Sequence, residues 1–255
     1  MEIKNLSKRS EEQKIFLRKH ITDPVFLENY LDAADLTLLQ SIYTQPIDTT
    51  HHDSAVSKHQ IRFAKGSLRS ELDHWVNEKF GKFLGNYTVD RIFGSTSESP
   101  TQIHTDSINI EDEAAPHKNI MIPLSVNGHT NMHKDWNGCQ TIYFDQVWLE
   151  RCGRSLFKKG YKSDNAREDI EVFDYSALDN VSNSIFPIDF YIKYLTHIPY
   201  AHCVGLSPLF IANWMLGSPV LFDRNRLHTS NNYTITGVKW KRFVCVFTNH
   251  ATNNT

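Results

Sequence analysis

The sequence predicts an α+β protein that is mainly β, a jelly roll with helices packed on it from the N-terminal side. Three observations predict this fold. Apolar residues recur at helical spacing within residues 1–85, and short β-branched or aromatic runs follow between 86 and 248. Turn sequences rich in Gly, Asn and Asp separate those runs. We therefore predict a single domain over residues 1–255, with 1–85 as a helical lead-in and 86–248 as the jelly-roll core.

The lead-in is predicted to hold two amphipathic helices, at residues 26–43 and 67–84. In the second, Leu72, Trp75 and Phe80 share one stripe, and Ser67 is a candidate N-cap. The strands of the core are predicted at 87–93, 103–108, 119–126, 140–145, 218–223 and 239–248.

A long insertion, residues 147–212, interrupts the strands. It is charged in its first part and rich in aromatic residues in its second. Loops on a rigid scaffold often carry specificity, so the insertion is expected to pack over the opening of the site. A contact between two copies of the chain, or an outer covering of the sandwich, remain open alternatives, and the oligomeric state is not predicted.

Composition narrows the function classes. Twenty-seven basic and twenty-nine acidic residues leave a formal charge of −2, which argues against a dedicated nucleic-acid binder or a polybasic membrane protein. No apolar run approaches the ~20 residues of a membrane span. The four cysteines form no Cys-x-x-Cys pair and read as reduced thiols, so the expected location is cytoplasmic.

Three His-x-Asp tripeptides occur, at 51–53, 104–106 and 133–135, where about one would be expected by chance. The first lies in a loop before the β region, and the third lies between turn sequences. Only His104 and Asp106 lie among strand-like residues, where positions i and i+2 point to one face. This pair is therefore the candidate for two ligands of a 2-His-1-carboxylate metal site.

The third ligand is predicted at His228, which follows a strand and a tight Asp-Arg-Asn turn. In the next strand, alternation places Trp240 and Arg242 on one face and Lys239 and Lys241 on the other. The lysine face is expected to be outside, so Arg242 is expected to point inward. A buried guanidinium needs a carboxylate partner, either from an internal Asp or from a bound dicarboxylate.

The order His104-x-Asp106, NIMIPLSV, TIYFD, an insertion, GSPVLFDRNRLHTS and KRFVCVF resembles the Fe(II)/2-oxoglutarate-dependent oxygenase superfamily, over about residues 87–248. The prolyl-hydroxylase-like and phytanoyl-hydroxylase-like branches are the most similar. The resemblance implies a double-stranded β-helix in which His104, Asp106 and His228 bind Fe(II), and Arg242 binds the distal carboxylate of 2-oxoglutarate.

The spacing from the distal histidine makes Lys239 the second choice for that carboxylate. A serine that some members carry two residues after the arginine is replaced by Val244, so Tyr143 or Thr141 is the expected source of a hydroxyl partner. Halogenating relatives carry a small residue at the position of Asp106, which argues against halogenation.

The resemblance implies an enzyme, a dioxygenase that uses Fe(II), 2-oxoglutarate and O2. Hydroxylation of a C–H bond in a small molecule or amino-acid-type substrate, with release of succinate and CO2, is the expected reaction. The alternative is a cupin-type metal-binding jelly roll that acts as an isomerase-like enzyme or a ligand-binding module. That protein would keep the metal ligands but would not need an inward cation on the last strand.

Overall fold

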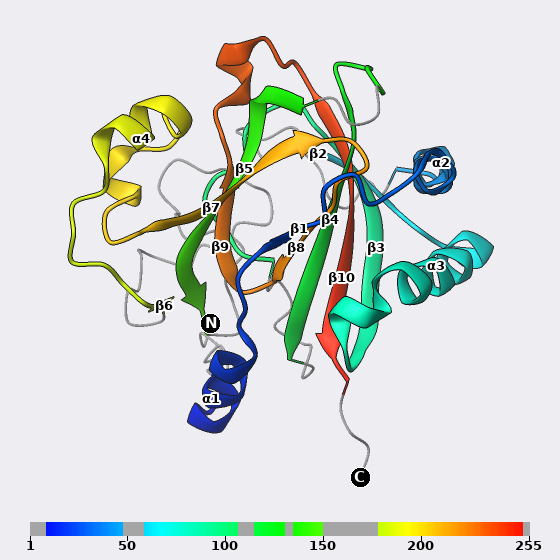
Figure 1. Ribbon diagram of the computed structural model, residues 1–255, viewed down its shortest axis with the longest axis horizontal. Helices are drawn as coiled ribbons and strands as arrows, with labels where there is room; N and C mark the ends of the chain where they lie inside the picture. Colours follow the sequence, from blue (N-terminus) through cyan, green and yellow to red (C-terminus); the bar gives the residue numbers. More distant parts are fainter. Residues whose placement is uncertain (1–8, 48–58, 107–114, 131–134, 150–177, 252–255) are drawn as a thin grey trace, which may run out of the picture.

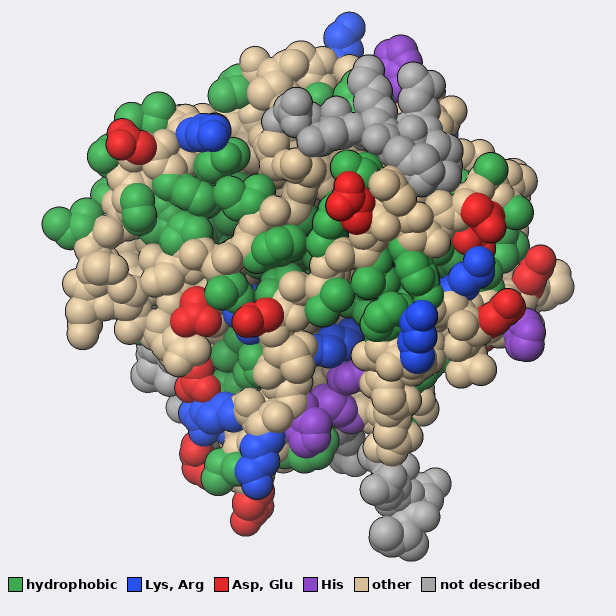
Figure 2. Space-filling model, in the orientation of Figure 1, with side chains coloured by type: hydrophobic (Ala, Val, Ile, Leu, Met, Phe, Trp, Pro, Cys, Tyr) green, Lys and Arg blue, Asp and Glu red, His purple; other side chains and the backbone are tan. Residues whose placement is uncertain are grey.

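The structure is a computed structural model, and it describes residues 9–47, 59–106, 115–130, 135–149 and 178–251. These residues form two antiparallel sheets with helices packed outside them, so the prediction of a mainly β, α+β fold is confirmed (Figure 1). Acidic and basic side chains are intermixed over the face shown in Figure 2, which agrees with the balanced charge. None of the described helices is long and apolar enough to cross a bilayer.

The first sheet has six strands in the order β1-β8-β4-β10-β3-β2, all antiparallel to their neighbours. Two of its strands come from the lead-in, which the sequence analysis assigned to helices alone. In sheet order the strands are β1 (Val25–Phe26), β8 (Val220–Asp223), β4 (Pro116–Val126), β10 (Lys241–His250), β3 (Tyr87–Ser97) and β2 (His59–Phe63).

The second sheet is built around β5, which pairs with three other strands. None of these three strands was predicted, because β6 and the start of β7 lie inside the expected insertion and β9 directly follows a turn. The strands are β5 (Asp135–Trp148), β6 (Leu178–Asp179), β7 (Pro208–Met215) and β9 (Arg226–Ser230).

The helices cover the outer faces of the sheets. In Figure 1, α2 and α3 lie beside β3 and β10, and α4 lies on the opposite side of the molecule. The helical segments are α1 (Glu11–His20), α2 (Ala33–Gln40), η1 (Ser41–Thr44), α3 (Gly66–Leu84), α4 (Ile188–Tyr194), η3 (Tyr200–His202) and η4 (Tyr233–Thr236).

Strand β10 packs against a different apolar core on each of its two faces. The core that a residue joins shows which way its side chain points. Val244 and Val246 belong to the core that α2 and α3 form against the six-stranded sheet. Cys245 and Phe247 belong to a second core that joins residues of both sheets. Between Lys241 and Phe247 the odd-numbered residues of β10 therefore point between the sheets and the even-numbered ones toward the helices.

The two predicted helices are present with different ends. Helix α2 begins only at Ala33, because Asp32 and Asp35 form a capping box in which each carboxylate accepts the other residue's backbone N–H, at 2.9 and 3.0 Å. Helix α3 follows Lys65 without a side-chain cap, so the assignment of Ser67 as its N-cap was wrong.

The described part of the predicted insertion is built into the fold. Phe186, Leu195 and Ile198 are fully buried, and they pack in one cluster with Ile142 and Phe144 on the outer side of β5. Strand β7 then runs along β5 as a full member of the second sheet. These contacts are those of a packed layer, and the part of the expected cover at 150–177 lies outside the described residues.

Candidate metal centre

His104, Asp106 and His228 meet at one point between the sheets. Their ligand atoms lie within 4.8 Å of one another, and no other group of three metal-ligating side chains is found among the described residues. His104 Nε2 lies 3.9 Å from Asp106 Oδ1, and His228 Nε2 lies 3.5 Å from Asp106 Oδ2. The other two His-x-Asp tripeptides, at 51–53 and 133–135, are not covered by the described side chains.

Backbone pairing brings the distal histidine to the first one. His104 and His228 lie opposite each other in an antiparallel bridge and exchange both backbone hydrogen bonds, each at 3.0 Å. The Asp106 N–H donates to the carbonyl of Arg224 at 2.7 Å, which continues the same alignment. Thr105, between the two ligands, is fully buried, and alternation directs it away from them. The predicted strand 103–108 is reduced to this bridge in its described part.

Each histidine has its ring orientation and tautomer fixed by a carbonyl. His104 Nδ1–H donates to Gln102 O at 2.7 Å, and His228 Nδ1–H donates to Arg226 O at 3.1 Å. A proton held on Nδ1 leaves the Nε2 lone pair free, which is the arrangement that metal-binding histidines adopt. Asn119 Nδ2 donates to Asp106 Oδ2 at 2.6 Å and orients the carboxylate in the same way.

The surroundings keep His228 uncharged. Burial first, and then repulsion from His104, lowers the pKa of His228 to about 4. Phe222 contacts its ring edge-on with centroids 4.7 Å apart, and Tyr143 stacks on it at 5.9 Å. At neutral pH the imidazole is therefore uncharged, and its Nε2 lone pair is available to bind a divalent cation.

The two residues proposed as hydroxyl partners lie on β5, two positions apart. Tyr143 is fully buried in the core between the sheets, and its hydroxyl has no hydrogen-bond partner among the described residues. Burial, followed by Asp106 and Cys245, raises the pKa of that hydroxyl. Thr141 is also buried and lies on the same face of the strand by alternation. Tyr143 is thus the residue whose contacts tie it to the centre.

The expected inward orientation of Arg242 was wrong. Arg242 is exposed, and its guanidinium lies over the rings of Tyr43 and Trp240, at 4.9 and 5.1 Å from their centroids. Lys239, the second choice, is exposed as well. The reason is the burial of both faces of β10, since the valines that seemed to mark the interior pack under α2 and α3.

Lys241 is the inward cation of this strand. It is only 3% exposed, and its ammonium lies 3.9 Å from the ring centroid of Trp214 and 4.8 Å from that of Tyr233. It forms no hydrogen bond or ion pair with another described residue, and burial lowers its pKa. Lys241 lies on the same face of the strand as Phe243 and Cys245, two positions and four positions further on. This second apolar face was the signal in the sequence that could have identified Lys241 as inward.

The Cys245 thiol is close enough to both Asp106 and Lys241 for each of their charges to affect its pKa. Asn119 Nδ2 lies 3.7 Å from Cys245 Sγ while it also donates to Asp106. Burial raises the pKa of Cys245, Asp106 raises it further, and Lys241 opposes both. Trp214, which Lys241 contacts, belongs to the same buried cluster as Cys245 and as Phe222, which contacts His228, so Lys241 and the triad border the same intersheet core.

No protein-family model and no curated protein matches the sequence. Among solved structures, the chain is similar to the non-haem α-ketoglutarate-dependent carbocyclase SnoK from nogalamycin biosynthesis (14% identity, 95% of this chain and 85% of that chain, TM-score 0.45). It is also similar to an oxidoreductase of the 2OG-Fe(II) oxygenase family from Burkholderia pseudomallei (11%, 94% and 89%, 0.47).

A third similar structure is a prolyl-4-hydroxylase from Pseudomonas putida (9% identity, 94% of this chain and 98% of that chain, TM-score 0.41). These proteins come from the superfamily that the sequence resembles. Their identities and TM-scores are low, so none of their properties is carried over to this chain.

Several histidines with low pKa values predict an acid-sensitive fold. Burial is the first cause of the low pKa of each, about 3 for His117 and about 4 for His197, His228 and His250. Figure 2 shows histidine side chains gathered at the lower part of the face drawn, and ring contacts join His20, His117 and His250.

Because an unfolded histidine titrates near 6.5, the unfolded chain binds more protons than the folded one between about pH 6.5 and pH 4. We therefore expect the free energy of unfolding of the metal-free protein to fall as the pH drops through that window. Chemical denaturation at several pH values measures it. His117→Gln should flatten the slope, and an unchanged slope in that variant would remove His117 from the explanation.

Proposed function

We propose that the protein is an Fe(II)- and 2-oxoglutarate-dependent dioxygenase, a single domain of residues 1–255 whose two sheets form the double-stranded β-helix. The observation that carries the proposal is a buried ammonium without an anionic partner, Lys241, in the same intersheet space as a 2-His-1-carboxylate triad. A buried charge is costly unless it is neutralised, and a bound dicarboxylate would neutralise it.

The triad fits Fe(II). His104, Asp106 and His228 supply two neutral imidazoles and one carboxylate, the ligand set of non-haem Fe(II) oxygenases, and leave positions open for other ligands. Held there, iron supplies the activation of O2 that oxidises a C–H bond while 2-oxoglutarate is converted to succinate and CO2. The protein's own part is to hold the ligands, bind the cosubstrate and keep water away.

Lys241 replaces Arg242 in this scheme as the residue for the distal carboxylate of 2-oxoglutarate. Its ammonium faces between the sheets, whereas the guanidinium of Arg242 lies on the outer side over Tyr43. The unpartnered hydroxyl of Tyr143 is the other polar group of this space that a ligand oxygen would satisfy. An apolar wall that includes Trp214 and Phe222 would exclude water around both.

A small molecule or an amino-acid-type compound is the proposed substrate, and hydroxylation is the proposed outcome. The same residues would serve a ring closure or a desaturation, because the oxidising chemistry belongs to the metal and the substrate's placement selects the product. The alternative, a cupin-type metal protein that is not an oxygenase, would use the triad and leave Lys241 without a ligand.

Cosubstrate binding separates these two functions. The metal-free protein is loaded anaerobically with Fe(II) and titrated with 2-oxoglutarate, and with pyruvate as the analogue that lacks the distal carboxylate. We expect binding of 2-oxoglutarate that requires the metal and exceeds that of pyruvate at least tenfold. Succinate release in air, assayed over a panel of small molecules and peptides, then identifies the substrate class. Metal binding without 2-oxoglutarate binding would instead support the cupin-type function.

A further inference from the structure

We infer that Arg224 is a positioning residue that fixes Asp106 in its place as a metal ligand. The inference rests on the proposed metal centre and concerns a residue that the sequence analysis did not place in it. Arg224 lies in the turn between β8 and β9 and is 2% exposed. Its side chain does not reach the metal-binding atoms, so its effect would pass through the ligand it holds.

Arg224 contacts Asp106 in two ways at once. The Asp106 N–H donates to the carbonyl of Arg224 at 2.7 Å, and the guanidinium Nε of Arg224 donates to the carbonyl of Asp106 at 3.2 Å. Backbone and side chain of one residue thus hold both backbone polar groups of the other. This pair of bonds restrains the backbone of Asp106 and so the direction of its Cα–Cβ bond, while Asn119 orients the carboxylate itself.

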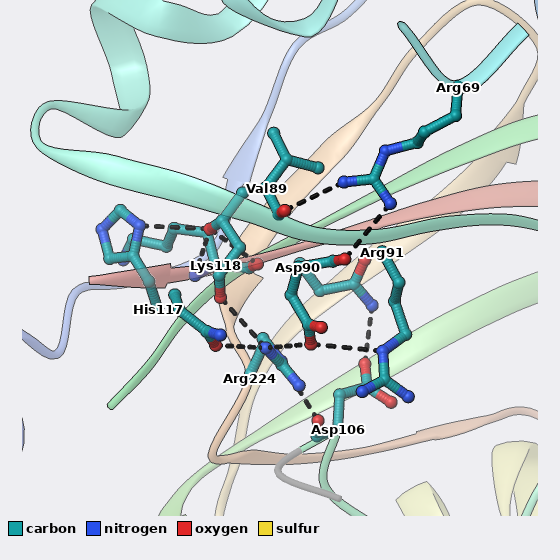
Figure 3. Close-up of polar contacts among 11 residues, drawn as sticks. Arg69, Val89, Asp90, Arg91, Asp106, His117, Lys118 and Arg224 are labelled. Carbon is teal, nitrogen blue, oxygen red and sulfur yellow. Dashed lines mark hydrogen bonds and ion pairs between the residues drawn. The ribbon is translucent and has the colours of Figure 1, made fainter. Parts of the chain in front are cut away.

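The far side of the guanidinium is anchored to the first sheet. Its NH1 lies 2.7 Å from Asn249 Oδ1 and 3.1 Å from the carbonyl of Thr248. The same atom lies 3.1 Å from Asp90 Oδ2, and the Cζ atom lies 4.5 Å from the ring centroid of Phe247. Figure 3 shows Arg224 between Asp90 and Asp106, with the dashed contacts running to both. Asp106 is therefore tied through one side chain to β3 and β10.

Asp106 needs such support more than His228 does. His228 lies inside β9, whose backbone is paired along β5. His104 and Asp106 lie in a segment that, within the described residues up to 106, forms only an isolated bridge and no continuous ladder of hydrogen bonds. An ion that demands ligand atoms within a few tenths of an ångström loses affinity when one ligand is free to turn.

The cost of burying Arg224 supports a specific role. Burial lowers the pKa of Arg224, and the charges of Asp90 and Asp106 oppose that shift. A purely apolar turn would avoid the penalty of desolvating a guanidinium. The guanidinium bonds four acceptors, which lie beside the metal ligand, on β3 and on β10. Its planar group carries several N–H donors, whereas a lysine ammonium at this position could not reach all four together.

The test compares Arg224→Lys with Arg69→Lys. Arg69 is a matched control because its guanidinium also binds β3, at the carbonyls of Val89 and Asp90, without contacting a metal ligand (Figure 3). Binding of Mn²⁺, an air-stable stand-in for Fe(II), is measured by calorimetry in both variants. We expect Arg224→Lys to weaken Mn²⁺ binding by about 10- to 100-fold, the usual effect of losing a residue that orients a ligand. Arg69→Lys should leave it unchanged.

A second variant keeps the inference testable if Arg224→Lys folds poorly. Asp90→Asn leaves the arginine in place but removes the charge that aims it, and it should weaken Mn²⁺ binding by a smaller factor. Equal metal affinity in wild type and Arg224→Lys, or an equal loss in Arg69→Lys, would overturn the inference. Failure of the proposed function looks different, since wild type would then bind Mn²⁺ and ignore 2-oxoglutarate while the Arg224 effect on the metal persisted.

Discussion

Replacing Asp106 by alanine is expected to abolish Fe(II) binding and 2-oxoglutarate turnover together. The variant keeps His104 and His228 but loses the one anionic ligand of the triad, whose oxygens lie 3.9 and 3.5 Å from the two Nε2 atoms. Two neutral imidazoles hold a divalent ion far more weakly than the complete set. Calorimetry with Fe(II) under anaerobic conditions and a succinate-release assay measure the two losses.

The same substitution in another His-x-Asp tripeptide is the matched control. Asp135→Ala should bind Fe(II) as wild type does, because the proposed centre lies at 104–106. A circular dichroism spectrum should show that both variants are folded. If Asp135→Ala lost the metal and Asp106→Ala kept it, the choice among the three tripeptides would be wrong.

The pairing of His104 with Asp106 was predictable because its signal is local. His104 and Asp106 are two positions apart, which fixes their common face once the segment is extended. His228 follows an apolar strand and a short turn, but its choice as the third ligand depended on the resemblance to the oxygenase superfamily. The strands β3, β4, β5, β8 and β10 were found for a similar reason, since short β-branched or aromatic runs between turn sequences are visible within a few positions.

The orientation of β10 was not predictable by the same rule. Alternation shows which residues share a face, but it does not show which face is the interior when both are apolar. Val244 and Val246 pack under helices, and Cys245 and Phe247 pack between the sheets. Only the position of α2 and α3 decides between them, and that position depends on contacts with residues far away in the sequence.

Asn119 and Arg224 were missed for a different reason. Each contacts a residue that is far away in the sequence and is brought near only by the pairing of strands. Asn119 on β4, for example, contacts Asp106 and Cys245 on two other segments. No spacing in the chain marks a contact between positions 224 and 106. Residues that orient ligands are therefore harder to find in one sequence than the ligands themselves.

Replacing Lys241 by methionine is expected to weaken 2-oxoglutarate binding by about 30- to several-thousand-fold while Fe(II) binding stays near wild type. Truncating one partner of a buried charge pair costs ~2–5 kcal/mol, and ~1.4 kcal/mol corresponds to tenfold. Among the described residues the ammonium contacts aromatic rings, at 3.9 Å from the Trp214 centroid and 4.8 Å from that of Tyr233, and no carboxylate. The variant without cosubstrate should therefore be at least as stable as wild type, because methionine is buried without a charge.

Arg242→Met provides the matched control on the next residue of the same strand. Its guanidinium lies on the outer side over Tyr43 and Trp240, so 2-oxoglutarate affinity should not change. Lys241→Arg should recover only part of the binding, because the larger planar group must fit against Trp214 where an ammonium lies. Anaerobic titration of each Fe(II)-loaded variant, with thermal unfolding of the ligand-free forms, measures all three. Loss of 2-oxoglutarate binding in Arg242→Met with normal binding in Lys241→Met would reverse the assignment of the two faces of β10, and the carboxylate site would then lie on the helix side of the sheet.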